Sequence, residues 1–106
     1  MATSVLEGFA WTAGALDRRK VVQCALSRVC AGCGKPLGRP VAFLGNDDEV
    51  GRNSFHVPPL HVACAEDLRA AGGGELQVVL TGGFEYVRPA RDDLDRDPRF
   101  EPNSLL

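Results

Sequence analysis

The sequence predicts a small α+β fold. Two observations carry this prediction: short apolar segments bounded by Gly and Pro suit strands, and other segments repeat their apolar residues at helical spacing. The chain has 106 residues, of which 44% are hydrophobic and 25% charged, so it has room for one domain. A domain of this size buries roughly 60–65% of the surface that its unfolded chain exposes. Its core is therefore small and gains from an internal staple.

The first predicted element is a helix that follows Asp17 and runs to residue 29. Asp is a favoured N-cap residue, so the helix has a clear start. Arg18, Arg19 and Lys20 crowd the first turn, where the helix dipole disfavours cations, and they therefore indicate a partner or a solvated face. The apolar residues of this helix fall within one broad arc: Val21, Val22, Cys24, Ala25, Leu26 and Val29.

Next come Cys30 and Cys33, which are followed directly by Gly34. A turn that wraps a metal between two cysteines bends sharply, and Gly adopts the positive φ that such a turn often needs at no steric cost. Backbone N–H groups in the turn can point at the sulfurs and stabilise thiolate charge. A redox pair is the alternative, but that motif opens a helix, whereas "GKPLGRP" at residues 34–40 cannot be helical.

A β-hairpin is expected after this turn. "PVAFLG" at residues 40–45 is short, apolar and bounded by Gly and Pro, which is typical of a strand. "SFHV" at residues 54–57 could return antiparallel to it, and the segment between them, residues 46–53, is predicted to be a polar loop.

His61 and Cys64 form a second pair directly after Pro58 and Pro59. Because Pro is tolerated in the first turn of a helix, we expect a helix to begin near Pro59 and to end at the glycines of residues 72–74. Residues three apart share a face of a helix, so His61 and Cys64 would point the same way.

The two pairs together supply three thiolates and one imidazole. This donor set completes a tetrahedral Zn²⁺ site and leaves no position for water, which is the arrangement of structural zinc sites. The sequence therefore predicts one structural Zn²⁺ bound by Cys30, Cys33, His61 and Cys64. Cys24, the remaining cysteine, is predicted to be a small buried hydrophobe rather than a ligand.

The last elements are a hairpin and a tail. "ELQVVL" at residues 75–80 and "FEYVR" at residues 84–88 flank "TGG", which predicts a second hairpin. From Pro89 the chain is charged and poor in apolar residues, so residues 89–106 are expected to form a flexible tail. Residues 1–88 would then form a single zinc-binding domain.

A knuckle, a hairpin and a helix that supplies two ligands together resemble the treble-clef zinc finger, over residues 28–72. "VCAGCGKPLGRPVAFLG" with "PPLHVACAEDL" also resembles small zinc-binding proteins of uncharacterised function from actinobacteria and their phages. Those proteins often continue the helix with an Ala-Cys-Pro-Phe-like segment, where this chain has "RAAGGGELQ". The resemblance implies a treble-clef-like core with an N-terminal helix, a C-terminal β-hairpin and a tail.

Treble clefs include the HNH nucleases, and "SFHVPP" superficially matches their catalytic histidine stretch. In that family a loop and a following Asn precede the helix, whereas here His56 lies only five residues before His61 and no Asn intervenes. The chain has two histidines, and one is assigned to zinc, so no acid–base cluster remains. We expect no enzymatic activity, with an HNH-like nuclease or a thiol redox protein as less favoured alternatives.

The charge distribution leaves two kinds of partner open. The formal net charge is −2, yet residues 17–39 carry six Lys or Arg against one Asp, whereas residues 75–106 carry four Arg against seven acids. A protein-interaction or adaptor role is favoured, and nucleic-acid binding through residues 17–39 is the alternative. The residues expected to contact such a partner are Arg18, Arg19, Lys20, Lys35 and Arg39.

No apolar run approaches the ~20 residues that a membrane-spanning helix needs, and the first residues show neither a basic leader nor a long apolar segment. We therefore expect a cytoplasmic protein with reduced thiols and no membrane association.

Overall fold

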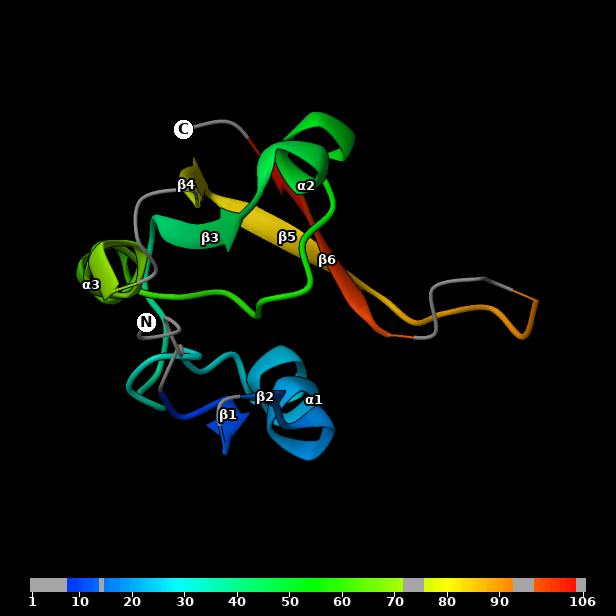
Figure 1. Ribbon diagram of the computed structural model, residues 1–106, viewed down its shortest axis with the longest axis horizontal. Helices are drawn as coiled ribbons and strands as arrows, with labels where there is room; N and C mark the ends of the chain where they lie inside the picture. Colours follow the sequence, from blue (N-terminus) through cyan, green and yellow to red (C-terminus); the bar gives the residue numbers. More distant parts are fainter. Residues whose placement is uncertain (1–7, 14, 72–75, 93–96, 105–106) are drawn as a thin grey trace, which may run out of the picture.

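The chain folds into three helices and three two-stranded antiparallel sheets within residues 8–13, 15–71, 76–92 and 97–104, which the computed structural model describes (Figure 1). The sheets pair β1 with β2, β3 with β4, and β5 with β6. In chain order the elements are β1 (Trp11–Thr12), β2 (Ala15–Leu16), α1 (Arg18–Ser27), β3 (Val41–Gly45), α2 (Asp47–Arg52), α3 (Val62–Ala71), β4 (Gln77–Thr81), β5 (Gly83–Val87) and β6 (Arg99–Ser104).

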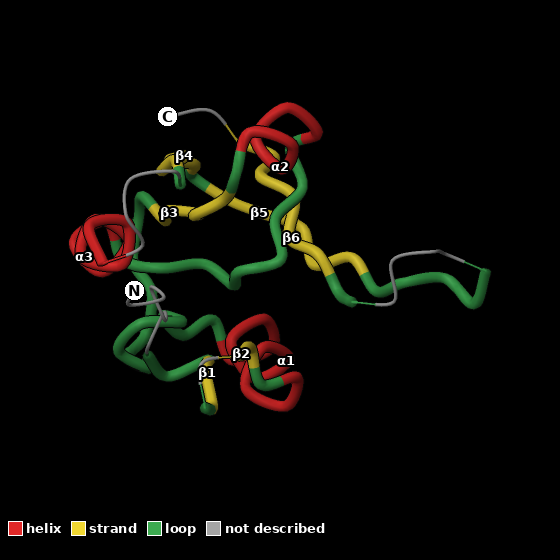
Figure 2. The backbone as a smooth tube through the Cα atoms, viewed as in Figure 1, coloured by secondary structure: helices red, strands yellow, loops and turns green. Residues whose placement is uncertain are grey.

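The elements form two layers. In the view of Figure 1, β1, β2 and α1 make the lower layer, the four longer strands and α2 make the upper layer, and α3 lies at one side. Residues 53–61 run from α2 to α3 between the layers (Figure 2). The radius of gyration is 12.9 Å, close to the value of about 13 Å expected for a compact domain of this length. The predicted small α+β fold is confirmed.

Two hydrophobic clusters share β3. All five residues of β3 are buried, and because alternate side chains of a strand point to opposite faces, it contributes to both clusters. The first cluster contains Ala10, Trp11, Cys24, Cys30, Ala31, Ala42, Leu44, Leu60, Ala65 and Leu68. The second contains Val21, Val41, Phe43, Phe55 and Phe100.

Helix α1 begins where the sequence predicts. The Asp17 side chain caps it by accepting the Arg19 backbone N–H at 3.0 Å. The Thr12 hydroxyl donates to the same carboxylate at 3.0 Å, and this hydrogen bond lowers the pKa of Asp17. The helix ends at Ser27, two residues earlier than expected, and Leu26 is 66% exposed, so only part of the predicted apolar arc is buried.

The predicted polar loop at residues 46–53 is wrong, because its centre forms helix α2. The Asn46 side chain accepts the Glu49 backbone N–H at 2.9 Å, and Glu49 accepts the Asn46 N–H at 3.1 Å. This reciprocal capping box gives the six-residue helix a stable first turn, although none of its side chains is buried.

The predicted hairpin between residues 40–45 and 54–57 is also wrong. Strand β3 pairs along its whole length with β4, and its other edge meets Leu60, which exchanges two hydrogen bonds of 2.8 Å with Ala42. Phe55 pairs with Phe100 of β6 instead. Helix α2 lies between β3 and Phe55 in the chain. The segment that follows α2 therefore pairs with β6 at Phe55 and does not form a hairpin with β3.

The predicted C-terminal hairpin and flexible tail need correction as well. Strand β4 pairs with β3 rather than with β5, and β5 pairs with β6, which lies inside the expected tail of residues 89–106. Phe100 is fully buried, with ring centroids 5.3 Å from Tyr86, 5.9 Å from Phe84 and 6.1 Å from Phe43. One aromatic side chain thus fixes an otherwise charged segment in the core.

Among the described residues, no helix has the length and apolar character needed to cross a membrane.

Candidate metal centre

Cys30 and Cys33 lie in a tight turn between α1 and β3, which we call the knuckle (residues 29–36). Its ends pair through Val29 and Pro36, and the Gly34 N–H donates to the Cys30 carbonyl at 2.8 Å. Gly34 has a φ of +75°, as the sequence predicts.

A second constraint at Gly34 was not predictable from the sequence. A Cβ there would lie 2.8 Å from a ring carbon of Phe9, which packs on the turn. Gly32 is similarly confined, because a Cβ would lie 3.0 Å from the Cβ of Cys64. The two glycines let the knuckle approach its neighbours closely.

His61 and Cys64 lie at the start of α3. This helix begins at Val62, later than the predicted start near Pro59, and the His61 carbonyl accepts the Ala65 N–H at 2.9 Å to open its first turn. Pro59 is buried in the extended segment before the helix, and its carbonyl accepts the Ala31 N–H at 2.9 Å. This hydrogen bond holds the segment against the knuckle and brings the two pairs together.

The four predicted ligand residues form one cluster. The sulfurs of Cys30, Cys33 and Cys64 and a ring nitrogen of His61 all lie within 4.8 Å of one another. His61 Nδ1 is 3.3 Å from Cys33 Sγ and 4.0 Å from Cys64 Sγ. Around a tetrahedral Zn²⁺ with ordinary bond lengths, neighbouring donors lie about 3.5–3.8 Å apart. This Cys₃His group could therefore hold a metal ion.

The His61 ring is oriented for coordination through Nδ1. Its Nε2 lies 2.9 Å from the Pro36 carbonyl, which can only accept, so Nε2 carries the proton. The neutral ring then leaves Nδ1 as the nitrogen with a lone pair, and Nδ1 is the atom that faces the sulfurs. A hydrogen bond from the second ring nitrogen to a backbone carbonyl is the usual support for a metal-bound histidine.

The four side chains differ in exposure. Cys30 is fully buried, His61 and Cys64 are half-buried, and Cys33 is exposed. Cys30 Sγ accepts the Gly32 N–H at 3.2 Å, as the turn geometry predicts, and also the His61 N–H at 3.3 Å. The second bond could not be predicted locally, because it joins residues 31 apart in the chain. Both N–H groups stabilise negative charge on the buried sulfur.

The thiols of Cys33 and Cys64 have opposite pKa shifts. Burial acts to raise the pKa of Cys33, but hydrogen bonds from the Lys35 backbone and from the other three cluster side chains outweigh it and lower the pKa to about 7. Burial raises the pKa of Cys64 to about 12, together with its contacts to Cys30 and Cys33. A metal ion binding here would therefore displace a proton from Cys64.

Cys24 is buried, as predicted, and lies in the first hydrophobic cluster rather than in the Cys₃His group. Burial raises its pKa to about 11, and the nearby Cys30 adds to the effect. The neutral thiol packs there as a small apolar group.

The predicted partner-contacting cations come from the start of α1, from the knuckle and from the segment before β3. The Lys20 ammonium lies 5.8 Å from the centroid of the Phe9 ring, which packs on Gly34 of the knuckle, and Lys35 is the exposed residue that follows Gly34. Arg18 and Arg19 are exposed at the start of α1, and Arg18 lines a separate cavity. Arg39 is exposed before β3.

Comparisons with known protein families, with curated proteins and with solved structures gave no match.

Proposed function

We propose that this chain is a non-enzymatic structural zinc-binding module with a protein-interaction or adaptor role. The observation that carries the proposal is the Cys₃His cluster, whose four donor atoms lie within 4.8 Å of one another. Three thiolates and one imidazole suit Zn²⁺, and four protein ligands leave no coordination position for a substrate. The site is therefore suited to holding structure rather than to catalysis.

The position of the cluster supports a structural role. Cys30 and Cys33 belong to the knuckle beside the lower layer, whereas His61 and Cys64 begin α3 at the side of the molecule. A zinc ion at this place would reinforce the hydrogen bonds that already join the two segments, from Ala31 to Pro59 and from His61 to Cys30 and Pro36. The order of knuckle, β3 and ligand-bearing helix resembles a treble clef. In this chain the single Ala42–Leu60 pair takes the place of the longer hairpin of a treble clef.

The metal content tests the proposal directly. Protein purified without chelator should carry one zinc per chain by elemental analysis, and stripping the zinc should abolish the near-UV circular dichroism of the folded core. The reason is that binding free energy at such sites is largely folding free energy, on the order of 10 kcal/mol or more. Protein that contains no zinc and keeps its spectrum in strong chelator would overturn the structural role.

A protein partner is supported by the outer face of α1. Leu26 is 66% exposed there, so a large apolar side chain faces solvent on a helix that also carries Arg19. The test is crosslinking in the source cells, followed by identification of the crosslinked protein and its purification. Leu26→Asp should weaken binding of that purified protein without changing zinc content or Tm, whereas equal binding by the variant would refute this surface.

Nucleic acid is a second candidate, favoured by the side chains around the knuckle. Lys20 and Lys35 there offer cations for phosphate, and Phe9 offers an aromatic ring for a base. Affinity for a single-stranded oligonucleotide should then fall steeply with salt and should be lost in the Lys20→Glu, Lys35→Glu variant. The absence of binding at low salt would eliminate this candidate.

A further inference from the structure

The three sulfurs of the Cys₃His group differ in their access to solvent. Cys30 is fully buried, and its Sγ accepts two backbone N–H groups, from Gly32 at 3.2 Å and from His61 at 3.3 Å. Cys64 is half-buried, whereas Cys33 is exposed. A reagent in solution therefore reaches the sulfur of Cys33 first.

Cys64 is the partner that the geometry offers to a modified Cys33. A Cβ at Gly32, the residue before Cys33, would lie 3.0 Å from Cys64 Cβ and 3.5 Å from Cys64 Sγ, so this part of the knuckle is in contact with Cys64. The sulfurs of Cys33 and Cys64 lie within 4.8 Å of each other. Because a disulfide holds two sulfurs about 2 Å apart, the pair has to approach by less than about 3 Å.

Cys30 is less suited to form this disulfide. Its two N–H hydrogen bonds stabilise negative charge on the sulfur and hold it in the core, and both effects oppose its attack on another sulfur. The buried Cys24 lies outside the group, in the first hydrophobic cluster. The exposed Cys33 and the half-buried Cys64 thus form the reactive pair.

We propose that Cys33 is the site at which a peroxide oxidises this protein, and that Cys64 then forms a disulfide with it. The proposal rests on the structural zinc role, because metal ligation keeps both cysteines as thiolates, the reactive form. The Cys33 thiolate attacks one oxygen of hydrogen peroxide, the O–O bond breaks, and a sulfenic acid forms as hydroxide leaves. The Cys64 thiolate then attacks the Cys33 sulfur, an S–S bond forms, the S–O bond breaks, and a second hydroxide leaves.

The reaction balances without any further reagent. The two sulfurs lose two electrons in total, the peroxide gains them, and each hydroxide takes a proton from solvent to become water. A disulfide sulfur carries no negative charge for a metal ion, so Cys30 and His61 remain as the only donors of the original four. Oxidation therefore releases the zinc, and a dithiol reductant restores the ligand set.

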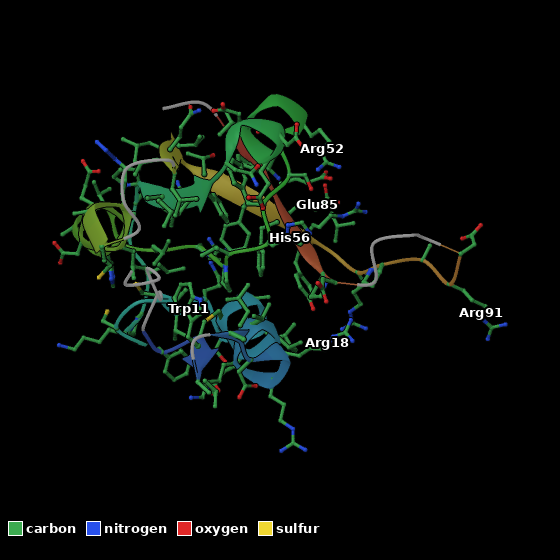
Figure 3. All side chains as sticks on the ribbon, in the orientation of Figure 1. Trp11, Arg18, Arg52, His56, Glu85 and Arg91 are labelled. Carbon is green, nitrogen blue, oxygen red and sulfur yellow. The ribbon has the colours of Figure 1, made fainter. Side chains whose placement is uncertain are left out.

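Hydrogen peroxide added to the zinc-loaded, full-length protein tests the proposal. A chromogenic chelator follows the released zinc, and peptide mapping without reductant identifies the disulfide. One zinc should be released for each disulfide formed, and dimedone, which traps sulfenic acids, should label Cys33 at early times. Trp11, the sole tryptophan, lies in the lower layer and is buried in the same cluster as Cys30 (Figure 3). Its fluorescence reports that the protein is folded before peroxide is added.

Tryptic peptides distinguish the alternative disulfides without any variant. Trypsin cuts after Lys and Arg except before Pro, so residues 29–52 form one peptide that holds Cys30 and Cys33. Cys64 lies in the peptide of residues 53–69. The proposed disulfide therefore joins the two peptides, whereas a disulfide between Cys30 and Cys33 stays within the first. Fragmentation of the joined pair identifies which cysteine of the first peptide is linked.

Cys24→Ser is the matched control, because it removes a buried thiol outside the group. Its zinc should be released at the same rate as that of the unaltered protein, and dithiothreitol with added zinc should restore the metal in both. A disulfide that involves Cys30, or zinc retained at peroxide concentrations that oxidise free cysteine, would overturn the proposal alone. Protein that carries no zinc before peroxide is added would overturn both this proposal and the structural zinc role.

Discussion

Replacing Cys64 with Ser should release the metal and unfold the protein. Cys64 Sγ lies 4.0 Å from His61 Nδ1 and within 4.8 Å of both other sulfurs, so its loss removes one of four donors. Structural zinc binding contributes about 10–16 kcal/mol. The total stability of a native domain is only about 5–15 kcal/mol, so losing even half of the zinc-binding free energy is enough to unfold a small domain.

Cys24→Ser is the matched control, because it makes the same chemical change at a buried thiol outside the cluster. It places a hydroxyl in an apolar site and should lower the free energy of unfolding by about 1–3 kcal/mol. The variant should nevertheless keep one zinc per chain, since no donor is lost.

The assay is zinc content by elemental analysis on both variants, combined with thermal unfolding followed by circular dichroism. Variants of Cys30, Cys33 and His61 should behave like Cys64→Ser. If Cys24→Ser lost the metal while His61→Ala kept it, the ligands would be the four cysteines and the assignment of His61 would be refuted.

Three further predictions concern the fold. Phe100→Ala should lower the free energy of unfolding by about 3–5 kcal/mol in denaturant titrations, because the ring is fully buried, whereas a mobile tail would give no change. Gly34→Ala should reduce both Tm and zinc affinity, because the left-handed backbone costs about 1–2 kcal/mol and the new methyl group meets Phe9; an unchanged Tm would contradict the tight packing. Asn46→Ala should cost about 1 kcal/mol through loss of the cap of α2, and Asn46→Asp should restore it, with hydrogen exchange of the α2 amides as the measurement.

The features that could be predicted from the sequence depend on contacts between residues close together in the chain. Asp17 caps α1 because its side chain reaches the Arg19 N–H two residues away, and Gly34 takes a positive φ because the knuckle turn requires it. The two ligand pairs were recognisable for the same reason. Even the capping box of α2 was present in the sequence as Asn46 and Glu49, but the polar character of the segment favoured a loop.

The strand pairing could not be predicted in this way. Val41 pairs with Thr81, forty residues later, and this choice depends on which apolar faces meet in the folded core rather than on either segment alone. Phe100 illustrates the limit. Its charged neighbours indicate a solvated tail, and only the rings of Phe43, Phe84 and Tyr86 explain why it is buried.

The segment of residues 53–61 carries both histidines of the chain. It is anchored to β6 through Phe55, to the knuckle through Pro59 and to β3 through Leu60. Its His56 ring is hydrogen-bonded to Glu49 of α2, and its His61 belongs to the metal cluster. One short segment therefore connects β6, the knuckle and β3. Loss of the metal should release this segment at its His61 end, so hydrogen exchange at the Leu60 and Ala65 amides should increase.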